Sequence, residues 1–66
     1  MNTKEIELTV VDFIAFLELP QDVRIIQKGN ILYTGSIARI PPVILNEKII
    51  RISIVFCTDI LRIEIE

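Results

Sequence analysis

"DVRIIQKGNILYTG", residues 22–35, is the stretch that decides the fold this sequence predicts. Two runs of strand-like composition flank Gly29 and Asn30, the two residue types that adopt a positive φ at the lowest cost. The pattern therefore predicts a β-hairpin. A phosphate-binding loop is excluded, because the stretch lacks both the G-x-x-x-x-G-K-[ST] spacing and the helix that follows such a loop.

The register of this hairpin depends on the length of its loop. A three-residue loop over residues 28–30 places Ile25 opposite Tyr33 and Val23 opposite Gly35. With a two-residue loop, apolar and polar side chains separate less well onto the two faces of the hairpin, so we prefer the three-residue loop. One face then carries Val23, Ile25, Ile31, Tyr33 and Ile37. Gly35 marks a bend or bulge in the second strand.

A second hairpin is predicted over "KIIRISIVFCTDILRIEIE", residues 48–66. With Thr58 and Asp59 as a two-residue turn, one face is fully apolar and the other is largely polar. The apolar pairs are Phe56–Leu61, Ile54–Ile63 and Ile52–Ile65, and the other face pairs Val55–Arg62, Ser53–Glu64 and Arg51–Glu66. A longer loop remains an alternative, because Thr-Asp is not the preferred sequence for a two-residue turn.

"TVVDFIAFLEL", residues 9–19, has the apolar spacing of a short helix. Thr9 is the expected cap, with Asp12 three residues later, and Pro20 ends the helix. The apolar stripe consists of Val10, Phe13, Ile14 and Leu17, whereas Val11 and Phe16 lie off it. So short a helix is not stable alone, so we expect it to pack across the sheet. Residues 4–9 fit either a short strand or a lead-in to this helix.

The chain is short enough to form one domain, residues 1–66, with the proline corner "PPVILNE" (41–47) between its two hairpins. Its composition is 52% hydrophobic, with one cysteine and no histidine. An internal disulfide is therefore excluded, and a structural zinc site is not expected. A body of this size has little interior for so much apolar surface. We therefore expect a homodimer or a higher homo-oligomer.

The residue types exclude most catalytic chemistry. Without histidine there is no Ser-His or Cys-His pair, and no two carboxylates have a spacing that indicates acid–base catalysis. Cys57 is read as a small packing residue. We expect no enzyme, no catalytic or metal-binding residues and no cofactor. No apolar run approaches the length of a membrane span, and no leader pattern opens the chain, so we expect a cytoplasmic protein.

Charge is segregated along the chain. Residues 1–22 carry one basic and five acidic side chains, whereas residues 23–62 carry six basic and two acidic ones. A basic sheet face that meets an acidic partner is one interpretation, and solvated faces are the other. The candidate interaction surface consists of the basic residues Arg24, Lys28, Arg39 and Arg51 and the apolar residues Val11 and Phe16.

"DVRIIQKGNILYTGSIARI", residues 22–40, resembles the opening of an Sm-like small barrel after a short N-terminal helix. Val23, Gly29, Gly35 and Ile37 lie near the matching places. The spacing from Gly29 to Gly35 is one residue longer than that family has, and its uridine-reading loop has no counterpart here. This resemblance, which SH3-like barrels share, implies a small β-barrel that binds nucleic acid.

The overall pattern of one apolar helix and four strands is also similar to that of small proteins encoded in bacterial genomes and prophages. That resemblance implies a binder rather than a catalyst, such as a phage-borne modulator of a host protein. The fold we predict is α+β, with one short N-terminal helix packed on a four-stranded, mainly antiparallel sheet of two hairpins. The alternative is the Sm-like or SH3-like barrel. The expected function is a non-enzymatic, homo-oligomeric interaction protein, and the alternative is nucleic-acid binding.

Overall fold

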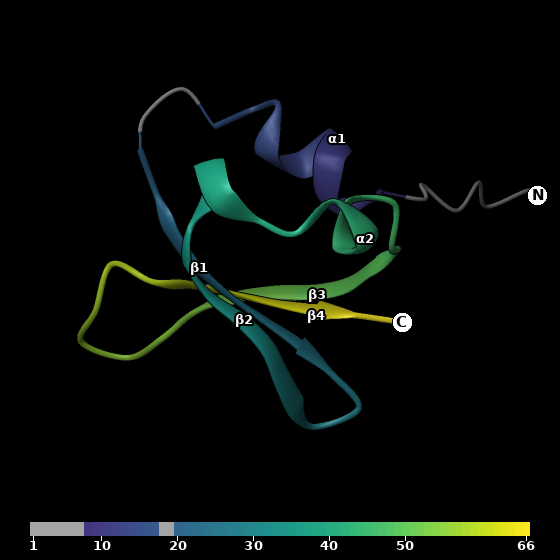
Figure 1. Ribbon diagram of the computed structural model, residues 1–66. Helices are drawn as coiled ribbons and strands as arrows, with labels where there is room; N and C mark the ends of the chain where they lie inside the picture. The colour runs from purple at the N-terminus through teal and green to yellow at the C-terminus, as the bar shows by residue number, and fades with distance from the viewer. Residues whose placement is uncertain (1–7, 18–19) are drawn as a thin grey trace, which may run out of the picture.

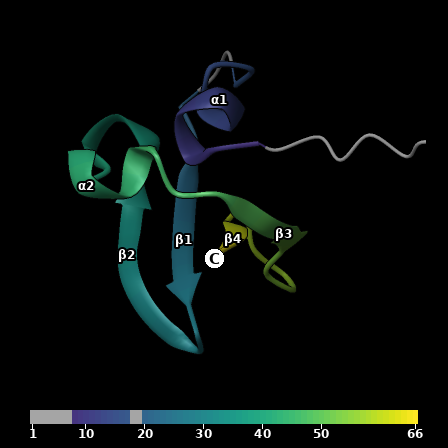
Figure 2. The same cartoon turned by 90° about the vertical axis from the view of Figure 1, so that its right-hand side faces the viewer.

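The computed structural model describes residues 8–17 and 20–66, which form a small α+β domain with one four-stranded sheet (Figure 1). The elements in chain order are α1 (Val10–Ile14), β1 (Asp22–Gln27), β2 (Asn30–Ser36), the 3₁₀ helix η1 (Ile37–Arg39), α2 (Pro42–Leu45), β3 (Ile49–Ile54) and β4 (Leu61–Ile65). Both α1 and α2 lie on the same side of the sheet, as the two views show (Figures 1 and 2). The predicted proline corner is confirmed, and α2 is its single helical turn.

The strand order is β2-β1-β4-β3. Each hairpin is antiparallel, but the two hairpins join through a parallel pairing of β1 with β4. The sheet is therefore mixed, and the mainly antiparallel character that the sequence predicts holds only within the hairpins. The sheet is also open, with β2 and β3 at its edges, so the alternative small-barrel fold is wrong. Closure would require β2 to pair with β3, and these strands lie at opposite edges.

The core lies between the sheet and the helices. Its buried members are Val10, Val23, Ile25, Ile40, Ile44, Ile63 and Ile65. The two central strands supply four of these side chains, alternating along each strand as a half-buried sheet requires. Phe13 and Ile14 of α1 are partly buried against this cluster, as the helical stripe predicts.

The first hairpin turns through Lys28 and Gly29, whose φ values are 51° and 83°. The predicted three-residue loop is wrong by one residue, but the pairs Ile25–Tyr33 and Val23–Gly35 are confirmed. The shorter loop and these two pairs are compatible because a β-bulge between Ile25 and Ile26 accommodates one extra residue of β2. Beyond this bulge Ile31 pairs with Ile26, so Ile31 lies on the face opposite to the predicted one.

The second hairpin has a longer loop than the predicted two-residue turn. Val55 N donates to Ile60 O at 2.9 Å, which leaves residues 56–59 as the loop. The Thr58 hydroxyl donates to Val55 O at 2.8 Å and accepts from Ile60 N at 3.1 Å. These bonds fix a four-residue loop that the apolar pattern of the strands does not specify.

The predicted cross-strand pairs of this hairpin are consequently wrong by two residues. Ile54 pairs with Leu61, Ile52 with Ile63, Ser53 with Arg62 and Arg51 with Glu64. Because side chains alternate with a period of two, a shift of two residues keeps the paired side chains of β3 and β4 on their predicted faces. The exception is Phe56, which is predicted opposite Leu61 and lies in the loop instead. The sorting into an apolar and a polar face is therefore retained.

The capping box that the sequence predicts at the start of α1 is present. Asp12 N donates to the Thr9 hydroxyl, and Thr9 N donates to the Asp12 carboxylate, both at 3.3 Å. The helix ends at Ile14, well before the predicted end. The next turn has hydrogen bonds between residues three apart, as in a 3₁₀ helix, such as Leu17 N to Ile14 O at 3.0 Å. The predicted last residues, 18 and 19, lie outside the described residues.

Most of residues 4–9, for which the sequence leaves strand or lead-in open, also lies outside the described residues. In the described part of this segment, Thr9 forms an isolated antiparallel bridge with Lys48. Ile49 N donates to Leu8 O at 2.8 Å, and Val10 N donates to Glu47 O at 3.0 Å. These bonds attach the start of α1 to the start of β3.

Gly35 holds a backbone conformation that only glycine tolerates well. Its φ is 149°, and a Cβ at this position would lie 2.9 Å from the Tyr33 hydroxyl oxygen. That hydroxyl is fixed, because it donates to Ser36 O at 2.6 Å. Gly35 therefore both bends β2 and makes room for the tyrosine.

We predict that Gly35→Ala lowers the free energy of unfolding by about 2 kcal/mol, through backbone strain and the clash with Tyr33. Gly29→Ala is the matched control, because Gly29 also has a positive φ but nothing within 4 Å of its added Cβ. This control should lower the free energy of unfolding by only about 1 kcal/mol, through backbone strain alone. Urea unfolding of both variants measures the difference, and equal losses would contradict the role assigned to Tyr33.

Candidate functional site

The sheet has one face that no helix of the described residues covers, which we call the open face. Strand register sets its composition in two rows that each cross all four strands. The first row is Thr34, Arg24, Arg62 and Ser53, and the second is Ile31, Ile26, Glu64 and Arg51. Every member of the first row is a hydrogen-bond donor, and none is a carboxylate.

A groove of about 420 Å³ runs along this face. The first hairpin contributes Arg24, Ile26 and Ile31, and the second contributes Ser53, Phe56 and Arg62. Ile26 forms an apolar floor with an exposed fraction of 6%, whereas Ile31 is well exposed. The groove therefore combines a cationic row, at Arg24 and Arg62, with an apolar end at Ile26 and Ile31.

Arg24 has an unusual environment in this groove. Its Nε atom is buried and has no hydrogen-bond partner among residues 8–17 and 20–66. Its neighbour Arg62 lies 3.7 Å from a Glu64 carboxylate oxygen, but this ion pair is partly exposed, and such pairs contribute little to stability. Among the described residues Arg24 forms no ion pair of this kind, so its charge is the less compensated of the two.

The structure separates the residues that the sequence groups as one interaction surface. Arg24 and Arg51 lie on the open face, and Lys28 lies in the β1–β2 turn. Arg39 is exposed at the end of η1, a segment that runs on the helix side of the sheet (Figure 1). Val11 and Phe16 are exposed on or just after α1.

The candidate surface omits Arg62, which the structure places beside Arg24. The alternation within the second hairpin assigns Arg62 to its polar face, so its orientation is visible in the sequence. Its proximity to Arg24 is not, because that depends on the parallel pairing of β1 with β4. Cys57, read from the sequence as a packing residue, is exposed in the β3–β4 loop, where it has a φ of 62°.

The free edge of β3 carries a row of exposed apolar side chains. The side chains of Ile50, Ile52, Ile54 and Phe56 are 62%, 38%, 69% and 88% exposed. We call these four residues the β3 edge. The bonds from Leu8 and Val10 cover only residues 47–49, and no strand of the described chain pairs with the rest of that edge.

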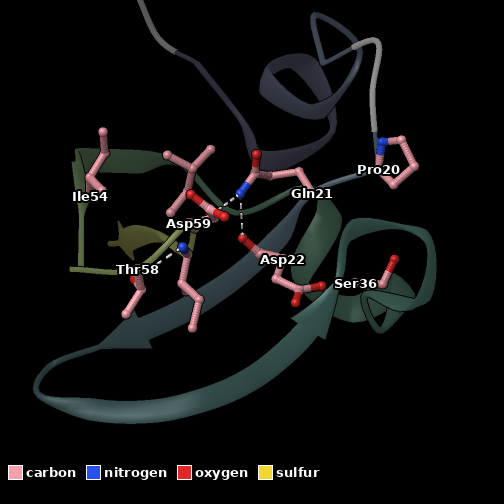
Figure 3. A pocket seen from close by; sticks show the side chains of 9 residues that line it. Pro20, Gln21, Asp22, Ser36, Ile54, Thr58 and Asp59 are labelled. Carbon is pink, nitrogen blue, oxygen red and sulfur yellow. Dashed lines mark hydrogen bonds between the residues drawn. The ribbon is translucent and has the colours of Figure 1, made fainter. Parts of the chain in front are cut away.

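A second pocket, of about 720 Å³, lies where β1 begins and the β3–β4 loop ends (Figure 3). Gln21 spans it, because its side-chain amide donates to the carbonyl oxygens of Asp22 and Asp59. Both aspartates and Thr58 line this pocket. Within the described ranges no cluster of three metal-ligating side chains is found. We assign Gln21 a structural role in joining the first strand to the last loop.

Comparison with known proteins gives no relative for this chain: no family model matches it, and searches of curated proteins and of solved structures found no match. No helix in the described part of the chain has the length and apolar character needed to span a membrane.

Proposed function

We propose that this chain is a non-enzymatic interaction protein that acts as a homo-oligomer, with the β3 edge as its self-association surface. The observation that carries the proposal is the exposure of four large apolar side chains along one free strand edge. Exposed apolar edge strands pair readily with other strands, and soluble proteins usually protect them with charge or proline. In this edge, residues 50–56, only Arg51 is charged and there is no proline.

Backbone directions support pairing at this edge. Val55 N points toward β4, since it donates to Ile60 O. In an antiparallel strand the backbone groups of successive residues point to alternate sides. Ser53 therefore also points toward β4, whereas the N–H and C=O groups of Ile52 and Ile54 point outward. These outward groups have the spacing that a further antiparallel strand requires.

A second copy of the chain is a suitable partner for this strand. Two β3 strands related by a twofold axis at Ser53 pair Ile52 with Ile54 of the second copy. The same register places Arg51 opposite Val55 of the second copy, so like charges do not meet. It also brings Phe56 toward Ile50 of the second copy. All eight side chains of the two β3 edges then become partly buried.

The expected affinity is moderate. Partial burial of eight side chains contributes roughly 1.5 kcal/mol each to the free energy of binding. The loss of translational and rotational freedom on association opposes it by roughly 4–15 kcal/mol. Added backbone hydrogen bonds contribute on the order of 1 kcal/mol each. A dissociation constant of about micromolar order is consistent with these opposing free energies.

The test is light scattering over a dilution series. We expect a dimer at about 100 μM that dissociates near micromolar concentration, and Ile54→Lys should weaken the dimer at least about 30-fold because it places a charge at the interface. Val43→Lys is the matched control, because Val43 is 81% exposed on α2, away from the edge. A wild-type protein that is monomeric throughout would contradict the proposal, as would equal effects of the two lysines.

A different protein could use the same edge, as the resemblance to prophage-encoded proteins implies. Such a partner would add a strand to β3, which is a common mode of peptide recognition. It would compete with self-association, because both use the outward groups of Ile52 and Ile54. A monomeric wild-type chain would make this heterologous pairing the leading interpretation of the β3 edge.

A second candidate function is nucleic-acid binding, supported by the register that gathers Arg24, Arg51 and Arg62 on one face. If these side chains contact phosphates, Arg51→Glu should weaken oligonucleotide binding about tenfold and reduce its salt dependence. Arg39→Glu is the charge-matched control on the helix side. Fluorescence anisotropy at several salt concentrations measures both. Salt-independent binding, or an unchanged affinity for Arg51→Glu, would contradict this candidate.

A further inference from the structure

We propose that the groove on the open face binds a small carboxylate with a short apolar body. The carboxylate would lie between Arg24 and Arg62, and the apolar body would lie on Ile26 against Ile31. This inference is separate from the proposed self-association, because it uses the face of the sheet rather than the outward backbone groups of β3.

The donor row provides the anion-binding end. Arg24 and Arg62 are directly opposite each other on neighbouring strands, whose backbones run about 4.8 Å apart in a sheet. Like charges in this relation repel each other, and their own row contains no carboxylate to relieve the repulsion. Thr34 and Ser53 extend the row on either side with hydroxyl groups. An anion between the two guanidinium groups would convert this repulsion into paired, charge-assisted hydrogen bonds.

The buried Nε of Arg24 is an independent observation that points to a ligand. A buried donor normally has a hydrogen-bond partner, and each exception in a folded protein requires an explanation. This donor has none within residues 8–17 and 20–66, although its side chain lines a groove open to solvent. A bound carboxylate would accept from the planar guanidinium fork, to which its geometry is matched.

The apolar end of the groove specifies the rest of the ligand. Ile26 is 6% exposed and lies opposite the well-exposed Ile31 in the second row, and both side chains line the groove. Its volume of about 420 Å³ falls within the range of small-molecule sites, roughly 300–1,000 Å³. A ligand with both a carboxylate and a few carbon atoms would use both ends.

The neighbouring charge favours a single anionic group over a polyanion. Glu64 lies in the next row and contacts Arg62 at 3.7 Å, so it opposes a second negative charge. The open face carries three arginines, Glu64 and, at the start of β1, Asp22, which leaves an excess of one positive charge. A monovalent carboxylate matches this balance better than a phosphate chain does.

The test is titration of the full chain with octanoate, followed by backbone amide chemical shifts. We expect saturable shifts at Arg24, Ile26 and Arg62, and affinity at least tenfold higher for octanoate than for octanol. Arg24→Gln and, independently, the more exposed Arg62→Gln should each reduce octanoate affinity at least fivefold. Arg39→Gln removes the same charge on the helix side and should leave the affinity unchanged.

Five results would overturn the proposal. Equal binding of octanol would show an apolar groove without anion recognition. Equal losses in Arg39→Gln and Arg62→Gln would show only general charge attraction. The third is an absence of octanoate binding to the wild-type chain. Tighter binding of octyl phosphate than of octanoate would show that the groove prefers a small phosphate ligand to a carboxylate. Tighter binding of a short oligothymidylate than of octanoate would show that it prefers a nucleic acid.

Discussion

The parallel pairing of β1 with β4 is the contact on which the rest of this structure depends. It joins two hairpins that are otherwise separate, and it places Ile25 beside Ile63 in the core. The same pairing places Arg24 beside Arg62 on the opposite face. A single long-range register therefore produces both the apolar core and the cationic row. It also fixes β2 and β3 as the edges of the sheet.

The helices of the described chain cover only part of one face. A sheet of four strands has two faces and two edges, and short helices such as α1 and α2 cannot cover all four. The uncovered face and the uncovered edge at β3 are consequently the two places where we propose that this protein meets other molecules. Their chemistry differs, since the face combines arginine with isoleucine and the edge is almost purely apolar.

Local features of this fold are predictable from sequence, and non-local ones are not. The capping box at Thr9 and the pairs of Ile25 with Tyr33 follow from short-range pattern and are confirmed. The loop of the second hairpin depends on the Thr58 hydroxyl and on a positive φ at Cys57, which side-chain alternation does not encode. The pairing of β1 with β4 joins residues far apart in the chain. The alternation in each hairpin therefore predicts the face on which Arg24 or Arg62 lies, but not that the two arginines are neighbours.

Backbone hydrogen exchange at the β3 edge is the most direct test of the central claim, that this edge is an interaction surface. If two copies pair there, the amides of Ile52 and Ile54 exchange slowly in concentrated protein and quickly after dilution below the dissociation constant. Val55 is the internal control, because its amide is bonded to Ile60 O within one chain and its protection should not follow dilution in the same way. Fast exchange of Ile52 and Ile54 at every concentration would contradict the account.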